Sequence, residues 1–267
     1  MLNTGLFAQV YRWLSKRRVE PIVSSRPPLR QLMTVHSLRM RLDPSEAIQS
    51  AMAAGAYEPE QTAWARECLL PGDRFVDVGA SFGWYAALAS TIVGPKGSVF
   101  AFEPSPLASS VIDNTIAENQ LKNVMLVRAA VGTTSGHEHI YMPVNDAVHS
   151  PSAFPSDASF VPLQVPLISL DRYEPLSDGR MIKLIKIDVE GYEPNVIRGM
   201  RELARKGVVK NIFLEFNSGW LKRNATTPDE LLRLVTSYGF RGFCCKLSGV
   251  GGIADPVWER RPMRRGW

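Results

Sequence analysis

Residues 74–85 read RFVDVGASFGWY, and this stretch decides the fold. The apolar and β-branched residues at 75–78 predict a strand, the small residues at 79–83 predict a turn, and WYAAL after it predicts a helix. A strand that turns through small residues into a helix can direct backbone N–H groups at a ligand. Gly79 and Gly83 can adopt a positive φ and leave no Cβ between backbone and ligand. An ordinary tight turn is the alternative explanation for these two glycines alone.

The spacing of the glycines indicates which ligand is bound. Dinucleotide-binding folds usually have G-x-G-x-x-G, whereas this chain has Asp77-x-Gly79-x-x-x-Gly83. The carboxylate of Asp77 would repel a pyrophosphate but suits a cationic amino acid. Glu103 ends the next predicted strand, where an acid can accept hydrogen bonds from ribose hydroxyls. A ribose and a cation without a pyrophosphate fit S-adenosylmethionine (SAM).

The composition is that of a globular protein, with 267 residues of which 45% are hydrophobic and 21% charged. This length suits one large domain with an extension. We expect an N-terminal extension over residues 1–54, a cofactor-binding domain over 55–256 and a basic tail over 257–267. Within the extension, residues 4–18 predict an amphipathic helix and the prolines in 19–32 predict a linker.

The net charge of +5 is unevenly distributed. Residues 1–50 carry eight Lys/Arg and three Asp/Glu, residues 257–267 carry four Arg and one Glu, and the remainder is net acidic. Because no basic stripe lies beside the predicted site, we expect no nucleic-acid partner. The basic ends are either solvated tails or contacts for an anionic membrane surface or an acidic partner.

Three features bear on location. The sequence has no run of 18 apolar residues, so we expect no transmembrane helix. The charges near the N-terminus follow its apolar part, unlike a secretory signal. Three cysteines without metal-type spacing favour a reduced, cytoplasmic setting. Peripheral membrane contact through the N-terminal helix remains an open alternative, as does the oligomeric state.

Strands and helices alternate along the core of the sequence. We predict strands at 74–79, 97–103, 124–131, 182–187 and 208–217, and helices at 83–93, 105–120 and 193–205. This alternation indicates βαβ units and a parallel sheet, with helices on both faces. Residues 240–247 and the segment near 257–258 would complete it. The Pro- and Ser-rich loop 143–160, which contains His149, predicts a substrate lid.

Polar residues follow four of the predicted strands. They lie at 77–81, at Glu103, at 188–190 and at 215–217. Ligands collect at the carboxyl ends of the strands of an open parallel sheet, so these groups should converge on one site. Asp188 follows a strongly apolar strand and needs a partner, although a helix-capping or turn aspartate is the plain alternative. Glu58 and Tyr57 precede the central strand and either fold over the cofactor or cap a helix.

The motifs GAYEPEQ, DRFVDVGASFGWYAALAS, VFAFEPSP, VPLISLDRY, IKLIKIDVEGYEPNVIRGM and NIFLEFN resemble those of the FkbM-type methyltransferases over residues 55–217. The most specific element is IKIDVEGYE at 185–193. The resemblance implies a class I SAM-dependent methyltransferase (Rossmann-like) fold, with a seven-stranded, mostly parallel sheet whose last strand is antiparallel. It also implies O-methylation of a hydroxyl on a sugar, glycolipid, polyketide or other secondary metabolite.

The resemblance also implies roles for individual residues. The methionine part of SAM would lie against Asp77, Gly79, Ala80, Ser81 and Gly83. Glu103, followed by Pro104, would hold the ribose, and Ala129 and Ala130 would lie near the adenine. Asp188 and Glu190 would face the methyl group and the acceptor. Ser81 departs from the family, which often has Asn there, but either side chain can hydrogen-bond the cofactor.

The chemistry leaves several alternatives open. The general base is Asp188, Glu190 or His149, and His149 is otherwise a surface histidine. Oxygen ligands from Asp188, Glu215 and Asn217 could hold Mg²⁺, or these residues could bind substrate only. A nicotinamide-dependent oxidoreductase is disfavoured because G-x-G-x-x-G is missing. A catalytically silent module with the same fold is the remaining competing interpretation.

Overall fold

The computed structural model describes residues 30–143, 160–244 and 256–260. The strands are β1 Gln31–Val35, β2 Leu38–Leu42, β3 Arg74–Val78, β4 Ser98–Phe102, β5 Val124–Val127, β6 Ala130–Val131, β7 Gly136–Pro143, β8 Phe160–Ile168, β9 Ile182–Ile187, β10 Val209–Leu214, β11 Phe240–Cys244 and β12 Pro256–Arg260. The helices are α2 Ala47–Ala53, α3 Pro59–Cys68, α4 Trp84–Val93, α5 Pro106–Asn119, α6 Glu193–Arg198, α7 Arg201–Arg205, α8 Ser218–Arg223 and α9 Pro228–Ser237. The predicted helix at 4–18 and the loop with His149 lie outside the described residues.

Seven of the described strands form one sheet in the order β11-β12-β10-β9-β3-β4-β5. The five strands from β10 to β5 are parallel, and β12 runs antiparallel to both β10 and β11. This arrangement confirms the predicted α/β fold with its antiparallel last strand. Most residues of the five parallel strands are apolar, as expected for a sheet whose two faces are covered by helices.

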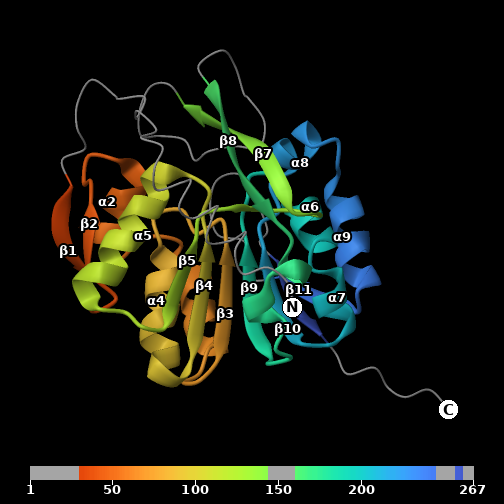
Figure 1. The fold of residues 1–267 in the computed structure, drawn as a ribbon, viewed down its shortest axis with the longest axis horizontal. Helices are drawn as coiled ribbons and strands as arrows, with labels where there is room; N and C mark the ends of the chain where they lie inside the picture. Colours follow the sequence, from red (N-terminus) through yellow and green to blue (C-terminus); the bar gives the residue numbers. More distant parts are fainter. Residues whose placement is uncertain (1–29, 144–159, 245–255, 261–267) are drawn as a thin grey trace, which may run out of the picture.

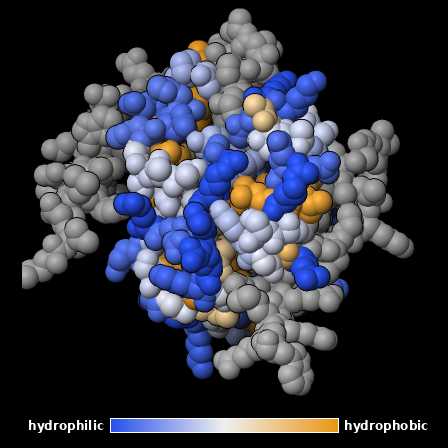
Figure 2. All heavy atoms as spheres, turned by 90° about the vertical axis from the view of Figure 1, so that its right-hand side faces the viewer, coloured by the Kyte–Doolittle hydropathy of each residue, from blue (hydrophilic) through white to orange (hydrophobic). Residues whose placement is uncertain are grey.

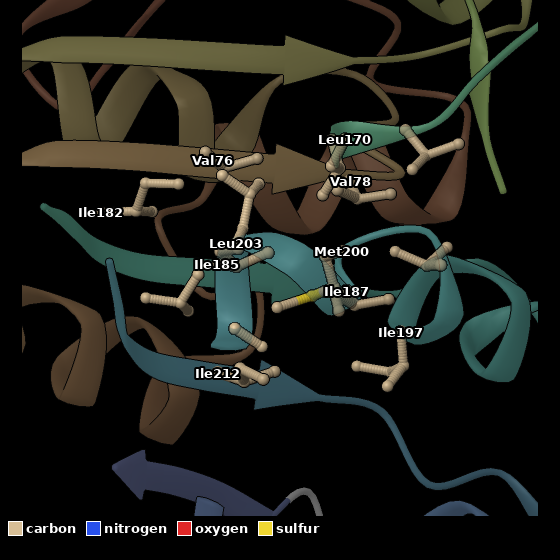
Figure 3. Packing of buried hydrophobic residues seen from close by; sticks show 14 of the residues in the cluster. Val76, Val78, Leu170, Ile182, Ile185, Ile187, Ile197, Met200, Leu203 and Ile212 are labelled. Atoms are coloured by element: carbon tan, nitrogen blue, oxygen red, sulfur yellow. The ribbon is translucent and has the colours of Figure 1, made fainter. Parts of the chain in front are cut away.

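Alternate residues of the central strands enter two separate cores. Val76 and Val78 of β3 face the same side as Ile185 and Ile187 of β9, and they pack with side chains of α6 and α7 (Figure 3). The opposite side chains, such as Phe75 and Leu184, pack against α3 and α4. In Figure 1 the two layers of helices stand on either side of the sheet. The period-2 alternation therefore sets which residues reach each helix layer.

The β1–β2 hairpin lies on the α4 and α5 side of the molecule (Figure 1). Val35, Met40 and Leu42 are buried in the same core as α4. Arg41 donates to the carboxylate of Glu118 on α5, with Nε 2.9 Å from Oε1. Residues 30–54 therefore pack on the domain predicted over residues 55–256. The division at residue 54 stays a prediction, and the predicted linker ends earlier because β1 begins at Gln31.

The helix predicted over 193–205 is divided in two. The backbone of Gly199 passes so close to Gly132 that a Cβ on Gly199 would lie 2.0 Å from the carbonyl oxygen of Gly132. A new helix, α7, starts after Met200, and Asp171 accepts hydrogen bonds from the N–H groups of its residues Glu202 and Leu203. A contact between distant segments therefore determines the break.

The strand predicted over 124–131 is also divided. β5 ends at Val127, and Ala130–Val131 turns away to pair with β8 in a second sheet of order β6-β8-β7. The hairpin of β7 and β8 extends from the upper edge of the main sheet (Figure 1). β12 takes residues 256–260 into the main sheet, so the tail predicted over 257–267 begins inside a strand.

The surface beside α7 and α9 is mainly hydrophilic where it is described, with small separate hydrophobic spots (Figure 2). It shows no broad apolar area within those residues. Among the helices that the structure describes, none has the length and apolarity needed to cross a lipid bilayer.

Candidate active site

A cavity of about 220 Å³ lies where the carboxyl ends of β3, β4, β9 and β10 meet. Each of these strands is followed by residues that line it. They are Gly79 and Ser81 after β3, Glu103 and Pro104 after β4, Asp188, Val189 and Glu190 after β9, and Glu215 after β10. Ala129 and Ala130 line another part of the wall, as do Tyr57 and Glu58. The predicted convergence of the strand ends is present.

Glu103 is bound to the loop that follows β3. Its Oε2 accepts a hydrogen bond from the N–H of Ser81 at 2.8 Å, and its Oε1 accepts one from the N–H of Ser105 at 2.7 Å. Burial raises its pKa to about 7, although these two backbone donors oppose the shift. Each carboxylate oxygen has two lone pairs, so Glu103 can still accept hydrogen bonds from a ligand.

The turn after β3 has positive φ at Gly79, Ser81 and Gly83 (79°, 50° and 88°). A Cβ on Gly79 would lie 1.9 Å from the carbonyl oxygen of Asp188, so this glycine lets the turn approach the end of β9. The N–H groups of Gly79 and Ala80 both donate to the carbonyl of Phe102. The turn therefore uses these N–H groups to hold itself against β4 and not to face a ligand.

Lys186 is the central cation beneath the cavity. It lies in register with Asp77 on the neighbouring parallel strand, so the two side chains share one face of the sheet. Its Nζ is 2.9 Å from Oδ2 of Asp188 and 4.9 Å from the ring centre of Tyr85. Burial disfavours its charge, but the negative charges of Asp188, Asp77 and Glu58 raise its pKa above the ordinary value. Lys186 therefore stays protonated and neutralises part of the acidic cluster.

Asp77 lies behind the cavity wall. Its side chain is fully buried and is not part of the lining. The N–H of Ala86 interacts with it, yet neither oxygen accepts a well-formed hydrogen bond. Burial raises its pKa to about 6, while Lys186 opposes the shift. In this position the carboxyl group of Asp77 offsets the positive charge of Lys186.

Glu58 connects α3 to the cavity. It precedes α3 in a left-handed conformation, with φ of 43°, and its Oε2 accepts a hydrogen bond from the hydroxyl of Tyr85 at 2.6 Å. It makes no side-chain hydrogen bond to the start of α3. Burial raises its pKa, and Lys186 opposes the shift. The cavity position that the sequence suggested for Glu58 is therefore present, and the simple capping role is not.

The three acids that follow β9 and β10 are Asp188, Glu190 and Glu215, and they differ in protonation. Burial disfavours charge on Asp188, but Lys186 and the hydrogen bonds from Lys186 and Glu215 lower its pKa. Burial and the charge of Asp188 raise the pKa of Glu190 to about 8 and that of Glu215 to about 11. Near neutral pH, Asp188 is thus ionised, Glu215 carries a proton, and Glu190 titrates. The Asp188 side chain keeps 25% of its surface exposed, so a ligand in the cavity can reach it.

The predicted site residues fall into three groups. Glu58, Gly79, Ser81, Glu103, Pro104, Ala129, Ala130, Asp188, Glu190 and Glu215 line the cavity. Asp77, Ala80, Gly83 and Asn217 do not line it. Asn217 instead begins α8, where its Oδ1 accepts hydrogen bonds from the N–H groups of Gly219 and Trp220. His149 lies outside the described residues.

The geometry does not favour the predicted Mg²⁺ site. Asn217 uses its oxygen within α8, and Lys186 already pairs with Asp188. The described residues contain no group of three or more His, Cys, Asp or Glu side chains arranged to hold a metal ion. The metal alternative therefore has no support from the geometry of these residues.

The sequence reasoning missed Lys186 and three residues of the opposite wall. Glu138 and His139 from β7 line the cavity, and Tyr192 joins them through a 3.0 Å hydrogen bond from its hydroxyl to Oε2 of Glu138. A lysine on the buried face of the strand IKLIKI was the available signal for Lys186. No local pattern indicated that β7 would lie over the cavity.

Residues 77–241 match the family model described as the methyltransferase FkbM domain. This chain belongs to the FkbM methyltransferase family. The match covers the four strand ends that form the cavity and confirms the family that the sequence motifs indicated. The family is one of methyltransferases, so the nicotinamide oxidoreductase alternative is excluded for this FkbM domain.

One curated relative is the hexuronic acid methyltransferase AglP of Haloferax volcanii. It is 27% identical to this FkbM chain over 146 residues, which are 54% of the chain and 55% of the relative. The chain therefore matches only about half of the length of that protein.

Two solved structures show weaker similarity. An O-methyltransferase of Thermotoga maritima aligns with a TM-score of 0.47 at 13% identity, covering 79% of this chain and 68% of its own. Fibrillarin of Aeropyrum pernix with bound SAM aligns with a TM-score of 0.47 at 11% identity, covering 89% and 86% of the two chains.

SAM is the methyl donor of class I methyltransferases, and the cavity of this FkbM protein fits it. Glu103 offers carboxylate oxygens suited to ribose hydroxyls. Phe102, Pro104 and Ala129 supply an apolar wall suited to adenine. The partly exposed and ionised Asp188 suits the cationic part of the ligand. Together these groups provide the contacts that binding of SAM requires.

Proposed function

We propose that this FkbM protein is a SAM-dependent O-methyltransferase that acts on a hydroxyl of a sugar, a glycolipid, a polyketide or another secondary metabolite. The observation that carries the proposal is the meeting of Glu103, Asp188 and Glu190 from two strand ends in one cavity. One acid suits a ribose, and the other two suit a sulfonium and an acceptor hydroxyl. The relative named for hexuronic acid supports a sugar among these acceptor classes.

Within this proposal, Glu103 binds the ribose hydroxyls and Pro104, Ala129 and Ala130 contact the adenine. The turn with Gly79, Ala80, Ser81 and Gly83 shapes the methionine side. Asp77 acts indirectly, since it is buried beside Lys186 and not in the lining. Glu58 closes the cavity from the start of α3. The division into residues 1–54, 55–256 and 257–267 and the membrane contact of the N-terminus belong to the same proposal.

Bound SAM would supply a methyl group that is already activated by its sulfonium. The residues of the chain then have to align the acceptor oxygen and remove its proton, and alignment can contribute about 7–11 kcal/mol. A sugar hydroxyl is a weak nucleophile and benefits from a nearby base. Glu190 suits this role better than Asp188, because Lys186 stabilises the ionised form of Asp188 and so weakens it as a base.

The test is incubation of the purified protein with SAM carrying a ¹³C-methyl group and a panel of hydroxylated acceptors. NMR of the products distinguishes an O-methyl from an N-methyl or C-methyl group. We expect O-methyl products and no requirement for Mg²⁺, so that EDTA leaves the rate unchanged. Binding of S-adenosylhomocysteine without transfer to any acceptor would favour the catalytically silent module.

The pH dependence of transfer tests the choice of base. If Glu190 accepts the proton, kcat/KM rises with pH and levels off at or below about pH 8, since the cation of SAM lowers a pKa that starts near 8. If Asp188 is the base, the rate changes little with pH near neutrality, because Lys186 lowers the pKa of Asp188. The Glu190→Gln variant should lose the pH-dependent rise.

A further inference from the structure

The residues that line the cavity restrict the charge of the acceptor, and this inference rests on the proposed function. Six carboxyl side chains line it, from Glu58, Glu103, Glu138, Asp188, Glu190 and Glu215. Among the described residues, the lining contains no Lys or Arg side chain. Lys186 lies beneath the wall, where Asp77, Glu58 and Asp188 already surround it. The described lining therefore offers carboxyl groups but no lysine or arginine that could pair with a carboxylate ligand.

The acids divide between the two ligands. Glu103 and the apolar residues beside it belong to the cofactor side. Glu190, Glu138 and Tyr192 lie on the remaining part of the wall. Tyr192 donates its hydroxyl to Glu138 and so ties β7 to the start of α6. The carboxylate of Glu138 is thus held in place on the side left for the acceptor.

The charges of this wall oppose an anionic ligand. Asp188 is ionised but already pairs with Lys186. Burial and the charge of Asp188 raise the pKa of Glu190 and Glu215 to about 8 and 11, so further negative charge beside Asp188 is unfavourable. A second carboxylate in the same cavity would meet like charges at short range in a partly desolvated site, where such repulsion is strong.

We infer that the acceptor is a neutral or amino-bearing sugar whose hydroxyl is methylated, and not a uronic acid. The hydroxyls of a sugar can donate to Glu138 and Glu190, and an ammonium group can pair with Glu138. The Haloferax volcanii relative is, by contrast, named for a hexuronic acid. The carboxyl groups of this wall therefore indicate an acceptor different from that of this relative.

The test compares methyl transfer to three matched methyl glycosides, those of glucose, glucosamine and glucuronic acid, with the galactose and mannose series in parallel. We expect kcat/KM for the glucosaminide and the glucoside to exceed that for the glucuronide at least about tenfold. Equal or better transfer to any of the uronides overturns the inference but leaves the methyltransferase proposal intact.

A binding measurement tests the inference even when turnover is slow or absent. In protein saturated with S-adenosylhomocysteine, the neutral and amino glycosides should raise the melting temperature, and the uronides should not. Equal shifts from all three, or no shift and no transfer with any neutral or amino glycoside, contradict the inference. Binding of S-adenosylhomocysteine in the same experiment reports separately on the proposed function.

A charge change tests the role of Glu138. Glu138→Gln removes one negative charge and keeps an oxygen for Tyr192, so the ratio of uronide to glucoside kcat/KM should rise by about threefold to tenfold. Glu67→Gln is the matched control, because Glu67 is exposed on α3 outside the cavity lining. An unchanged ratio in Glu138→Gln, equal to that of Glu67→Gln, would remove Glu138 from the acceptor site.

Discussion

Lys186 is a buried cation beside several carboxyl side chains, and its contacts show how this site is held together. It pairs with Asp188 at 2.9 Å and lies in register with Asp77. A buried charge is tolerated when charges and hydrogen bonds compensate it. Lys186 therefore keeps Asp188 ionised while the neighbouring Glu215 carries a proton.

Replacing Lys186 by methionine should destabilise the protein by about 3–5 kcal/mol, because it leaves buried carboxylates without their cation. Urea unfolding measures the loss. Lys210→Met is the control, since Lys210 is exposed on β10, and it should change stability by at most about 0.5 kcal/mol. Similar losses in both variants would mean that Lys186 does not hold the cluster together. Adding Asp77→Asn to Lys186→Met should recover part of the loss.

Asp188→Asn should reduce kcat at least about a hundredfold while S-adenosylhomocysteine affinity stays within about tenfold of wild type. In the proposed function Asp188 faces the transferred group, whereas Glu103 and the apolar wall carry most of the cofactor contact. Single-turnover kinetics and calorimetry measure the two quantities. Asp229→Asn, at an exposed position on α9, serves as the control. Wild-type turnover in Asp188→Asn would remove Asp188 from the catalytic assignment.

At the residue scale, the sequence predicted the acids that end strands, because a polar residue after an apolar run marks a strand end. Glu103, Asp188 and Glu215 were found in this way. Asp77 was placed near the ligand, but β3 is buried over its whole length and directs Asp77 behind the wall. Glu138 and Tyr192 could not be predicted, since their meeting depends on how β7 lies over the sheet.

The β3–α4 turn is the element that sets the distance between β3 and the end of β9. Gly79→Ala places a methyl group against the carbonyl of Asp188 and also requires a left-handed alanine. Gly72→Ala has a similar φ, with no atom within 4 Å of the new Cβ, so it isolates the cost of the conformation. We expect Gly72→Ala to cost about 1–2 kcal/mol and Gly79→Ala about 1–3 kcal/mol more, measured by thermal unfolding. Equal costs would show that the turn can move away from β9.

The β7 strand and the start of α6 are joined by the Tyr192–Glu138 hydrogen bond. Tyr192→Phe removes the bond and leaves the ring, so Glu138 loses its fixed position. The KM for the acceptor should rise about threefold to tenfold, with kcat and the affinity for S-adenosylhomocysteine nearly unchanged. Tyr238→Phe, outside the cavity lining, is the control. A fall in kcat with unchanged KM would instead indicate a role for Tyr192 in the chemical step.

At the element scale, periodicity predicted the strands and helices of the parallel sheet well. The errors lie where distant segments meet. The break between α6 and α7 depends on Gly199 passing Gly132, and the end of β5 depends on β8 taking Ala130–Val131 as a partner. Neither contact has a local sequence pattern.

The whole molecule should become less stable as pH rises through neutrality in the absence of ligand. Burial raises the pKa of Glu103 and Glu193 to about 7 and that of Glu190 to about 8, from an ordinary value of 4.5. Between these values the folded protein keeps protons that the unfolded chain has released, so stability falls as pH rises. The melting temperature should therefore fall from about pH 5 to about pH 8.5, and less steeply in Glu190→Gln. A melting temperature that rises over this range would contradict the assigned protonation.

The central claim is that the acidic cavity binds the nucleoside and amino acid of SAM. Calorimetric titration of the purified protein with S-adenosylhomocysteine, with and without EDTA, tests this most directly. The account predicts one site of micromolar affinity that is unchanged by EDTA, with no heat from NAD in a parallel titration. Absence of binding in both conditions, or binding that EDTA abolishes, would contradict the claim that Glu103, Asp188 and Lys186 form a metal-independent SAM site.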